Sequence, residues 1–245
     1  MIEIKTISAL DKIINPSTVH PLQRASALRG ELYHFGLYAT STYTWATHSL
    51  ELVCNSANKD AVKIYHVKSS PVFLDNYAGH DDYVELDGEG IIPDILEEDL
   101  SALVLGSGKY LFFAIEVDCD KLPCGENKIE FLLKDAKDVE YDKAEFTLEV
   151  IDKALPKQEF AVTQWIHPDC IVHVHGVEIF STEFFHFFRK YVQAAVRYGQ
   201  NMLLTPLFTF PLDTVVSGER DNFQLVKVKV EKGGYSCNAL RFNQR

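Results

Sequence analysis

Short runs in which apolar and polar residues alternate dominate the first 155 positions of the chain. This period of two is typical of strands with one buried face. The pattern predicts strands in residues 31–39, 48–54, 62–67, 109–117, 128–133 and 144–151. Turn residues separate these runs at the spacing typical of two-sheet proteins. We therefore predict that residues 1–155 form an all-β sandwich domain.

The pattern changes after Leu155-Pro156, which we predict to be a domain boundary. Two apolar runs, residues 160–166 and 201–205, flank a segment with helical periodicity. The apolar face of that segment consists of Phe184, Phe188, Tyr191, Val192, Ala195 and Val196. Ser181 or Thr182 can cap its start, and Gly199 can end it.

Two apolar strands joined by a helix predict a βαβ unit with parallel strands. Polar residues gather beyond the carboxyl ends of both strands, where α/β barrels and open α/β sheets place their active sites. Those after the first strand are Gln164, His167 and Asp169, and those after the second are Thr205, Thr209, Asp213, Glu219 and Arg220. We therefore predict a mixed fold, with residues 156–245 forming the first βα units of an incomplete TIM-like (β/α)8 barrel.

Several blocks in this half resemble the opening of the catalytic domain of glycoside hydrolase family 123. They are TQWIHPDC, GQNMLLTPLFTFPLDT, the GER loop and QLVKVKV, in that order. Residues 73–93 are similar to the end of the first sandwich section in the same, mostly bacterial, proteins. The resemblance implies a β-sandwich followed by a (β/α)8 barrel. It also implies a β-N-acetylgalactosaminidase that uses the acetamido group of its own substrate as the nucleophile.

The resemblance also implies that this chain contains substrate-binding residues of the family's active site but not its catalytic residues. The acidic catalytic pair of the family lies on a later barrel strand, so we expect no catalytic residue and no activity in this chain alone. The expected function is that of a fragment of a hydrolase of β-linked N-acetylhexosamine glycans. The residues expected to line the substrate pocket are Trp165, His167, Asp169, Thr205, Asp213, Glu219 and Arg220.

Each of these residues also has a structural interpretation. Trp165 could stack on a sugar ring or belong to the core. Asp213 could bind a sugar hydroxyl or cap loop backbone. Glu219 and Arg220 could clamp substrate from the loop or form ion pairs.

His167, Cys170, His173 and His175 have the spacing H-x2-C-x2-H-x-H, which is not a standard zinc motif. We therefore predict no metal site and no cofactor. Residues 172–175 also depart from the family pattern, in which a small residue, an acid and aromatics are expected.

Charge and hydropathy restrict the partners. Residues 1–155 contain 14 basic and 27 acidic side chains, which argues against binding to nucleic acid. No stretch approaches the ~20 apolar residues of a membrane span, and the first residues lack a secretory signal, so we expect a cytoplasmic protein. A glycan is the expected partner of the full-length parent, and the open strand edges predict self-association. The alternative functions are a non-enzymatic sandwich that binds carbohydrate or protein, and a degenerate gene product.

Overall fold

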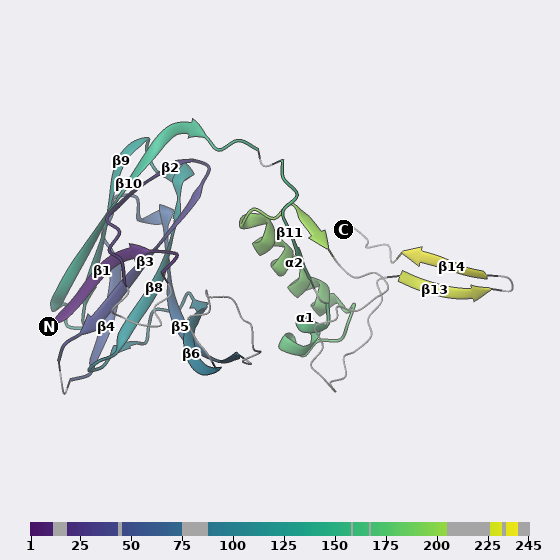
Figure 1. Ribbon diagram of the computed structural model, residues 1–245, viewed down its shortest axis with the longest axis horizontal. Coiled ribbons are helices and arrows are strands. Elements are labelled where there is room, and N and C mark those ends of the chain that lie inside the picture. Colours follow the sequence, from purple (N-terminus) through teal and green to yellow (C-terminus); the bar gives the residue numbers. More distant parts are fainter. Residues whose placement is uncertain are drawn as a thin grey trace. The chain divides into compact units, whose positions relative to one another are not determined.

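The computed structural model describes residues 1–11, 19–43, 46–74, 88–157, 159–166, 168–204, 226–231 and 234–239. The chain divides into two compact units, Met1–Pro156 and Lys157–Arg245 (Figure 1). Neither α-helix of the described residues is long and apolar enough to cross a membrane.

The first unit is built from two five-stranded sheets (Figure 1). The strands of the first sheet, in spatial order, are β1 (Ile2–Ser8), β3 (Leu32–Ser41), β8 (Tyr110–Asp118), β5 (Val62–Leu74) and β6 (Gly88–Glu97). Those of the second are β2 (Arg24–Arg29), β10 (Glu140–Ala154), β9 (Gly125–Lys134), β4 (His48–Cys54) and β7 (Leu103–Leu105). Among the described residues of this unit, 3-10 helices η2 (Lys59–Ala61) and η3 (Cys119–Lys121) lie in connections. Neighbouring strands are antiparallel, except that β10 and β2 are parallel.

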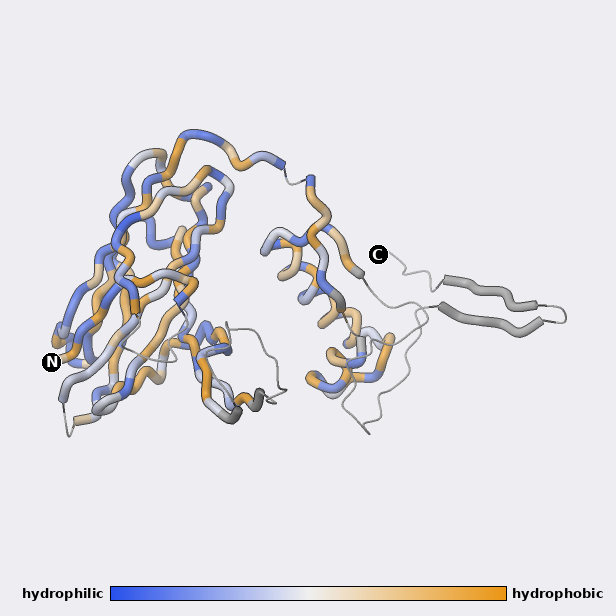
Figure 2. The backbone as a smooth tube through the Cα atoms, in the orientation of Figure 1, coloured by the Kyte–Doolittle hydropathy of each residue, from blue (hydrophilic) through white to orange (hydrophobic). Residues whose placement is uncertain are grey.

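The core of this unit lies between the two sheets. Phe35 of β3 stacks on Phe146 of β10, with ring centroids 4.0 Å apart, and meets Phe131 of β9 edge-on at 6.0 Å. All three rings are buried. Figure 2 shows hydrophobic and hydrophilic residues alternating along these strands. The alternation arises because successive side chains of a strand point to opposite faces, and it confirms the strands predicted from the period of two.

The outer face of the first sheet has a smaller apolar cluster around Ile7 and Tyr38. Gly36 lies beneath it on β3. A Cβ at this glycine would lie 2.8 Å from both Ile7 Cγ1 and Phe112 Cε2. The missing side chain therefore allows these two residues to cover the sheet.

The second unit begins with a parallel crossover. β11 (Thr163–Trp165) pairs in parallel with β12 (Met202–Leu204), and two helices, α1 (Pro168–His175) and α2 (Thr182–Arg197), lie between them in sequence. An antiparallel hairpin follows, formed by β13 (Val226–Glu231) and β14 (Gly234–Ala239).

The prediction of a TIM-like (β/α)8 barrel fragment is wrong. The described residues of this unit contain one crossover with two consecutive helices and then a hairpin, whereas a (β/α)8 barrel repeats one strand and one helix. The two apolar runs do form parallel strands, but each strand has only three residues. The start of the first run does not pair as a strand. Instead, the side chain of Asn201 accepts a hydrogen bond from Val162 N and donates one to Phe160 O.

The sequence reading also missed α1. Proline is favoured at the first position of a helix, because a backbone N–H at that position would have no acceptor within the helix. Asp169 lies in the first turn, and His173 and His175 lie in the last turn. This charge order suits the helix dipole, so the helix could have been found from its ends.

The ends of α2 agree with the prediction. Ser181 is the N-cap, and its Oγ accepts a hydrogen bond of 3.1 Å from Phe184 N. At the other end Gly199 has φ 86°. Gly199 N donates to Val196 O and Gln200 N donates to Ala195 O, which is the pair of bonds of a Schellman motif.

We predict that Ser181→Ala destabilises α2 by about 1 kcal/mol, because the amide of Phe184 loses its capping acceptor. Hydrogen exchange at the amides of the first turn should measure the loss. Thr182→Ala is the matched control, since Thr182 lies inside the helix. Equal effects of the two changes would contradict the assignment of Ser181 as the cap.

We also predict that the fragment Met1–Pro156 folds alone. Its main apolar core is formed entirely by residues of this unit, and a two-sheet core of this size is ordinary for an independent domain. Thermal unfolding should be cooperative, and the proton NMR spectrum should be dispersed. A spectrum typical of a disordered chain would show that the boundary is misplaced.

Candidate functional site

The carboxyl ends of β11 and β12 lie at one edge of the small parallel sheet, because Thr163 pairs with Met202 and Trp165 with Leu204. This is the kind of edge where α/β proteins bind ligands. The backbone of Trp165 is the last position of β11, and the structure does not describe its side chain. His167, Thr205, Asp213, Glu219 and Arg220 also lie outside the described residues. The predicted sugar pocket therefore stays a prediction.

Asp169 is the predicted site residue whose side chain the structure describes. It lies in the first turn of α1 and is only 3 % exposed. The first turn of a helix stabilises negative charge. The carboxylate is therefore placed to stabilise the start of α1, and its burial limits its contact with a ligand in solution.

A groove of about 430 Å³ lies beside β11, α1 and α2. Its α2 wall is a stripe formed by Tyr191, Ala194, Ala195 and Tyr198, at positions i, i+3, i+4 and i+7. Ile171 and Val174 of α1 add apolar surface, and Gln164 and Gln200 add amide groups. These side chains suit binding, since none of them is an acid–base group of the kind that cleaves a glycosidic bond.

The helical periodicity of the sequence predicted which face of α2 is apolar. Phe184, near the start of the helix, is indeed buried. Tyr191, in the last two turns of the helix, and Tyr198, its C-cap, are 44 % and 51 % exposed. The periodicity identifies the face of the helix but does not show whether anything covers it.

His175 belongs to the packing of α1 against α2. Its ring stacks on Phe187 with centroids 3.8 Å apart, and its Nε2 lies 3.1 Å from the hydroxyl of Tyr191. Among the residues that the structure describes, no three His, Cys, Asp or Glu side chains are grouped to hold a metal ion. His167 lies outside that search, so the absence of a metal stays a prediction.

A polar chain in the first unit was not predicted. The hydroxyl of Tyr141 donates to Asp135 Oδ2 at 3.4 Å and lies 3.3 Å from His48 Nδ1. Because the Tyr141 proton points to Asp135, His48 Nδ1 must carry the proton of the bond between His48 and Tyr141. His48 Nε2 is then a bare acceptor, and it is buried without a hydrogen bond. Burial raises the pKa of Tyr141, and the hydrogen bond from Val139 N lowers that of Asp135.

Cys119 has no role as a nucleophile. Its side chain is buried, and burial raises the pKa of the thiol to about 11. The reactive species of cysteine is the thiolate. Cys119 is therefore protonated and inert near neutral pH.

Comparison with known proteins identifies the class. Residues 165–244 match the family described as "Glycoside hydrolase 123, catalytic domain". The fold is similar to that of a family 123 glycoside hydrolase from Clostridium perfringens, studied for glycolipid glycan hydrolysis, with a TM-score of 0.74 and 12 % identity. The similarity covers 97 % of this chain and 43 % of that chain, so this chain spans less than half of the enzyme.

Other comparisons add little. A FixG-related protein from Vibrio parahaemolyticus matches with a TM-score of 0.29 and 14 % identity, over 62 % of this chain and 96 % of that protein. No curated protein matches the chain.

The chain is thus related to glycoside hydrolases. More specifically, residues 165–244 are similar to the catalytic domain of glycoside hydrolase family 123, the family that the sequence motifs predicted. The motifs TQWIHPDC and GQNMLLTP flank the parallel crossover of β11 and β12.

Proposed function

We propose that this chain is the substrate-binding part of a hydrolase that acts on β-linked N-acetylhexosamine glycans. The observation that carries the proposal is the match of residues 165–244 to a glycoside hydrolase catalytic domain. The solved enzyme of similar fold is described as hydrolysing the glycan of a glycolipid, which supports a glycan ligand.

The proposed roles follow from side-chain chemistry. Trp165 ends β11 and supplies a flat apolar face for a sugar ring. His167 and Thr205 follow the two strands in sequence and add polar walls, whereas Asp169 is buried in the first turn of α1 and supports the start of that helix. Asp213, Glu219 and Arg220 supply charged groups that hydrogen bond to hydroxyls.

Catalysis is not assigned to these residues. Glycosidases need an acid to protonate the leaving oxygen and a second group to assist at the sugar carbon. Asp169 is a single buried carboxylate and does not meet this need by itself. The catalytic acidic pair is instead expected elsewhere in the complete enzyme.

We predict that the chain binds N-acetylgalactosamine but does not hydrolyse a chromogenic N-acetyl-β-galactosaminide. Binding should change the tryptophan fluorescence, because the sugar ring would stack on Trp165. The sequence contains only one other tryptophan, Trp45, so the change can be assigned. Trp165→Phe should remove the change, and Trp45→Phe, the matched control, should keep it. The absence of a saturable change in the unaltered chain would contradict the binding role. Turnover that Asp213→Ala abolishes would show that a catalytic group is present.

The second unit is also proposed to self-associate, since exposed apolar surface of this kind is rare in monomers. Val174, Tyr198 and Met202 are 72 %, 51 % and 49 % exposed. We predict a particle larger than a monomer by light scattering, and a shift toward the monomer in Val174→Lys. Val104→Lys, at an exposed site of the first unit, is the control. A monomeric unaltered chain would contradict the proposal.

A non-enzymatic carbohydrate-binding sandwich is the second candidate function. One observation favours it, namely a small polar pocket in the first unit.

A further inference from the structure

A pocket of about 210 Å³ lies in the first unit, well away in sequence from the hydrolase motifs. Its lining includes Ser56 and Asn58 of the connection between β4 and β5, Val62 at the start of β5, Leu122 after η3, and Asn127 and Ile129 of β9. It is smaller than the 300–1,000 Å³ typical of pockets for drug-sized ligands. A single small ring is therefore the largest ligand that suits it.

Asn127 gives this pocket a fixed acceptor. The residue is only 8 % exposed. Its Nδ2 donates to Pro123 O and Gly125 O at 2.9 Å each, and to Leu148 O at 3.4 Å. Carbonyl oxygens only accept hydrogen bonds, so the nitrogen of the amide must face them.

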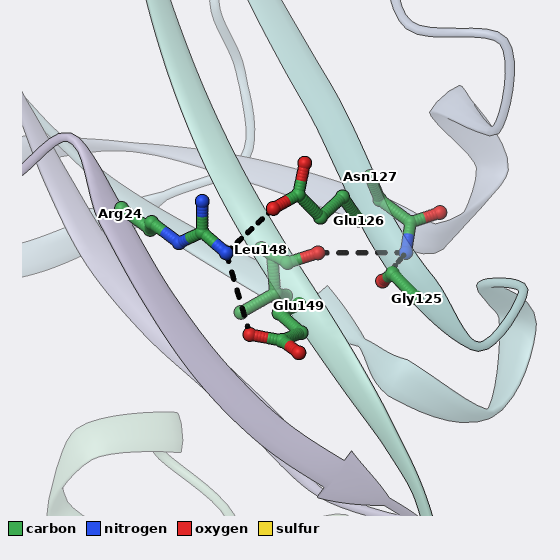
Figure 3. Close-up of polar contacts among 6 residues, drawn as sticks. All are labelled: Arg24, Gly125, Glu126, Asn127, Leu148 and Glu149. Atoms are coloured by element: carbon green, nitrogen blue, oxygen red, sulfur yellow. Dashed lines mark hydrogen bonds and ion pairs between the residues drawn. The ribbon is translucent and has the colours of Figure 1, made fainter.

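The orientation of the amide determines what Oδ1 can do. Figure 3 shows the oxygen of Asn127 directed away from Gly125 and Leu148. Within the described part of the chain no donor is hydrogen bonded to this oxygen. Asn127 thus presents an acceptor with an available lone pair in a pocket that it helps to line.

Two further polar groups complement this acceptor. Ser56 Oγ accepts a hydrogen bond of 3.0 Å from Glu130 N, which leaves the hydroxyl proton of Ser56 to donate. Asn58 precedes η2, and its side chain makes no capping hydrogen bond. An acceptor, a donor and an amide therefore share one small pocket, whose apolar walls are Val62, Leu122 and Ile129.

The two charged side chains that line the pocket, Glu126 and Lys128, are each paired with an opposite charge. Glu126 is paired with Arg24, which also reaches Glu149 (Figure 3). Lys128 is paired with Glu145 at 3.0 Å. A charged ligand would have to compete with these pairs, so the pocket favours a neutral ligand.

We propose that this pocket is a binding site for a single neutral sugar ring. The ring would donate a hydroxyl hydrogen bond to Asn127 Oδ1, accept one from Ser56 and form one with the side-chain amide of Asn58. Its C–H groups would lie against the aliphatic walls. The proposal rests on the geometry of the first unit alone. It therefore stands or falls independently of the hydrolase function proposed for the second unit.

The test is an NMR titration of the full chain with N-acetylgalactosamine, galactose and, as a polyol control, glycerol. We expect saturable shifts of the Asn127 side-chain amide and the Ile129 backbone amide with at least one of the two sugars. Asn58→Ala and Ser56→Ala should each weaken binding about three- to tenfold, since each removes one hydrogen bond. Asn55→Ala is the matched control, because Asn55 is exposed and does not line the pocket.

Three outcomes would overturn the proposal. The first is the absence of saturable shifts at about 50 mM sugar, which is well above the millimolar affinity of weak ligands. The second is an equal response to glycerol, which would indicate adventitious polyol binding. The third is equal weakening by Asn55→Ala. Persistence of the shifts in Trp165→Phe would separate this site from the one proposed in the second unit.

Discussion

The stack of Phe35 on Phe146 is the contact on which the first unit depends. The two rings come from opposite sheets, and Phe131 meets Phe35 from a third strand. Each sheet has an apolar face, and exposing that face to water is unfavourable. The two sheets bury their apolar faces by packing against each other. The packing of these rings holds together the two sheets, and strand β9, which carries Phe131, also carries Asn127.

In the residues that the structure describes, the second unit has no comparable core that covers its apolar surfaces. Parallel strands normally have both faces covered, yet Met202 and Leu203 of β12 are 49 % and 37 % exposed. Tyr191 and Tyr198 leave the stripe of α2 partly open in the same way. The local elements of this unit are well formed, as the caps of α2 show, but its apolar surface is incompletely buried.

This contrast explains what could be predicted from the sequence. Strands of the sandwich follow from a period of two, and α2 follows from its period, Ser181 and Gly199, because these signals are local. The barrel was predicted wrongly because one parallel crossover is also local, whereas the number of repeats that follow it is a property of the whole fold. Strand β2, with its small residues, and α1, with eight residues, are too short or too weakly patterned for periodicity to reveal.

The candidate sites show the same limit. Trp165 and Asp169 were predicted as site residues because they lie near a predicted strand end, and this assignment stays a prediction. Asn127 was missed, although the sequence contains a signal for it. Asn127, Ile129, Phe131 and Leu133 share the buried face of β9, so a polar residue stands where the period of two expects an apolar one. What it does there depends on Pro123 and Leu148, which only the folded chain brings to it.

Asn127 and His48 show how the same unit treats buried polar groups in two ways. Both side chains have one end held by hydrogen bonds, in His48 through Tyr141 and Asp135 and in Asn127 through three carbonyls. The free end of His48, Nε2, is enclosed and reaches no partner, which costs stability and offers a ligand no access. Asn127 lines a pocket, and because its direction is already fixed, a ligand would not have to order this side chain on binding. Fixed orientation together with access, rather than burial alone, is what distinguishes a binding group from a structural one in this sandwich.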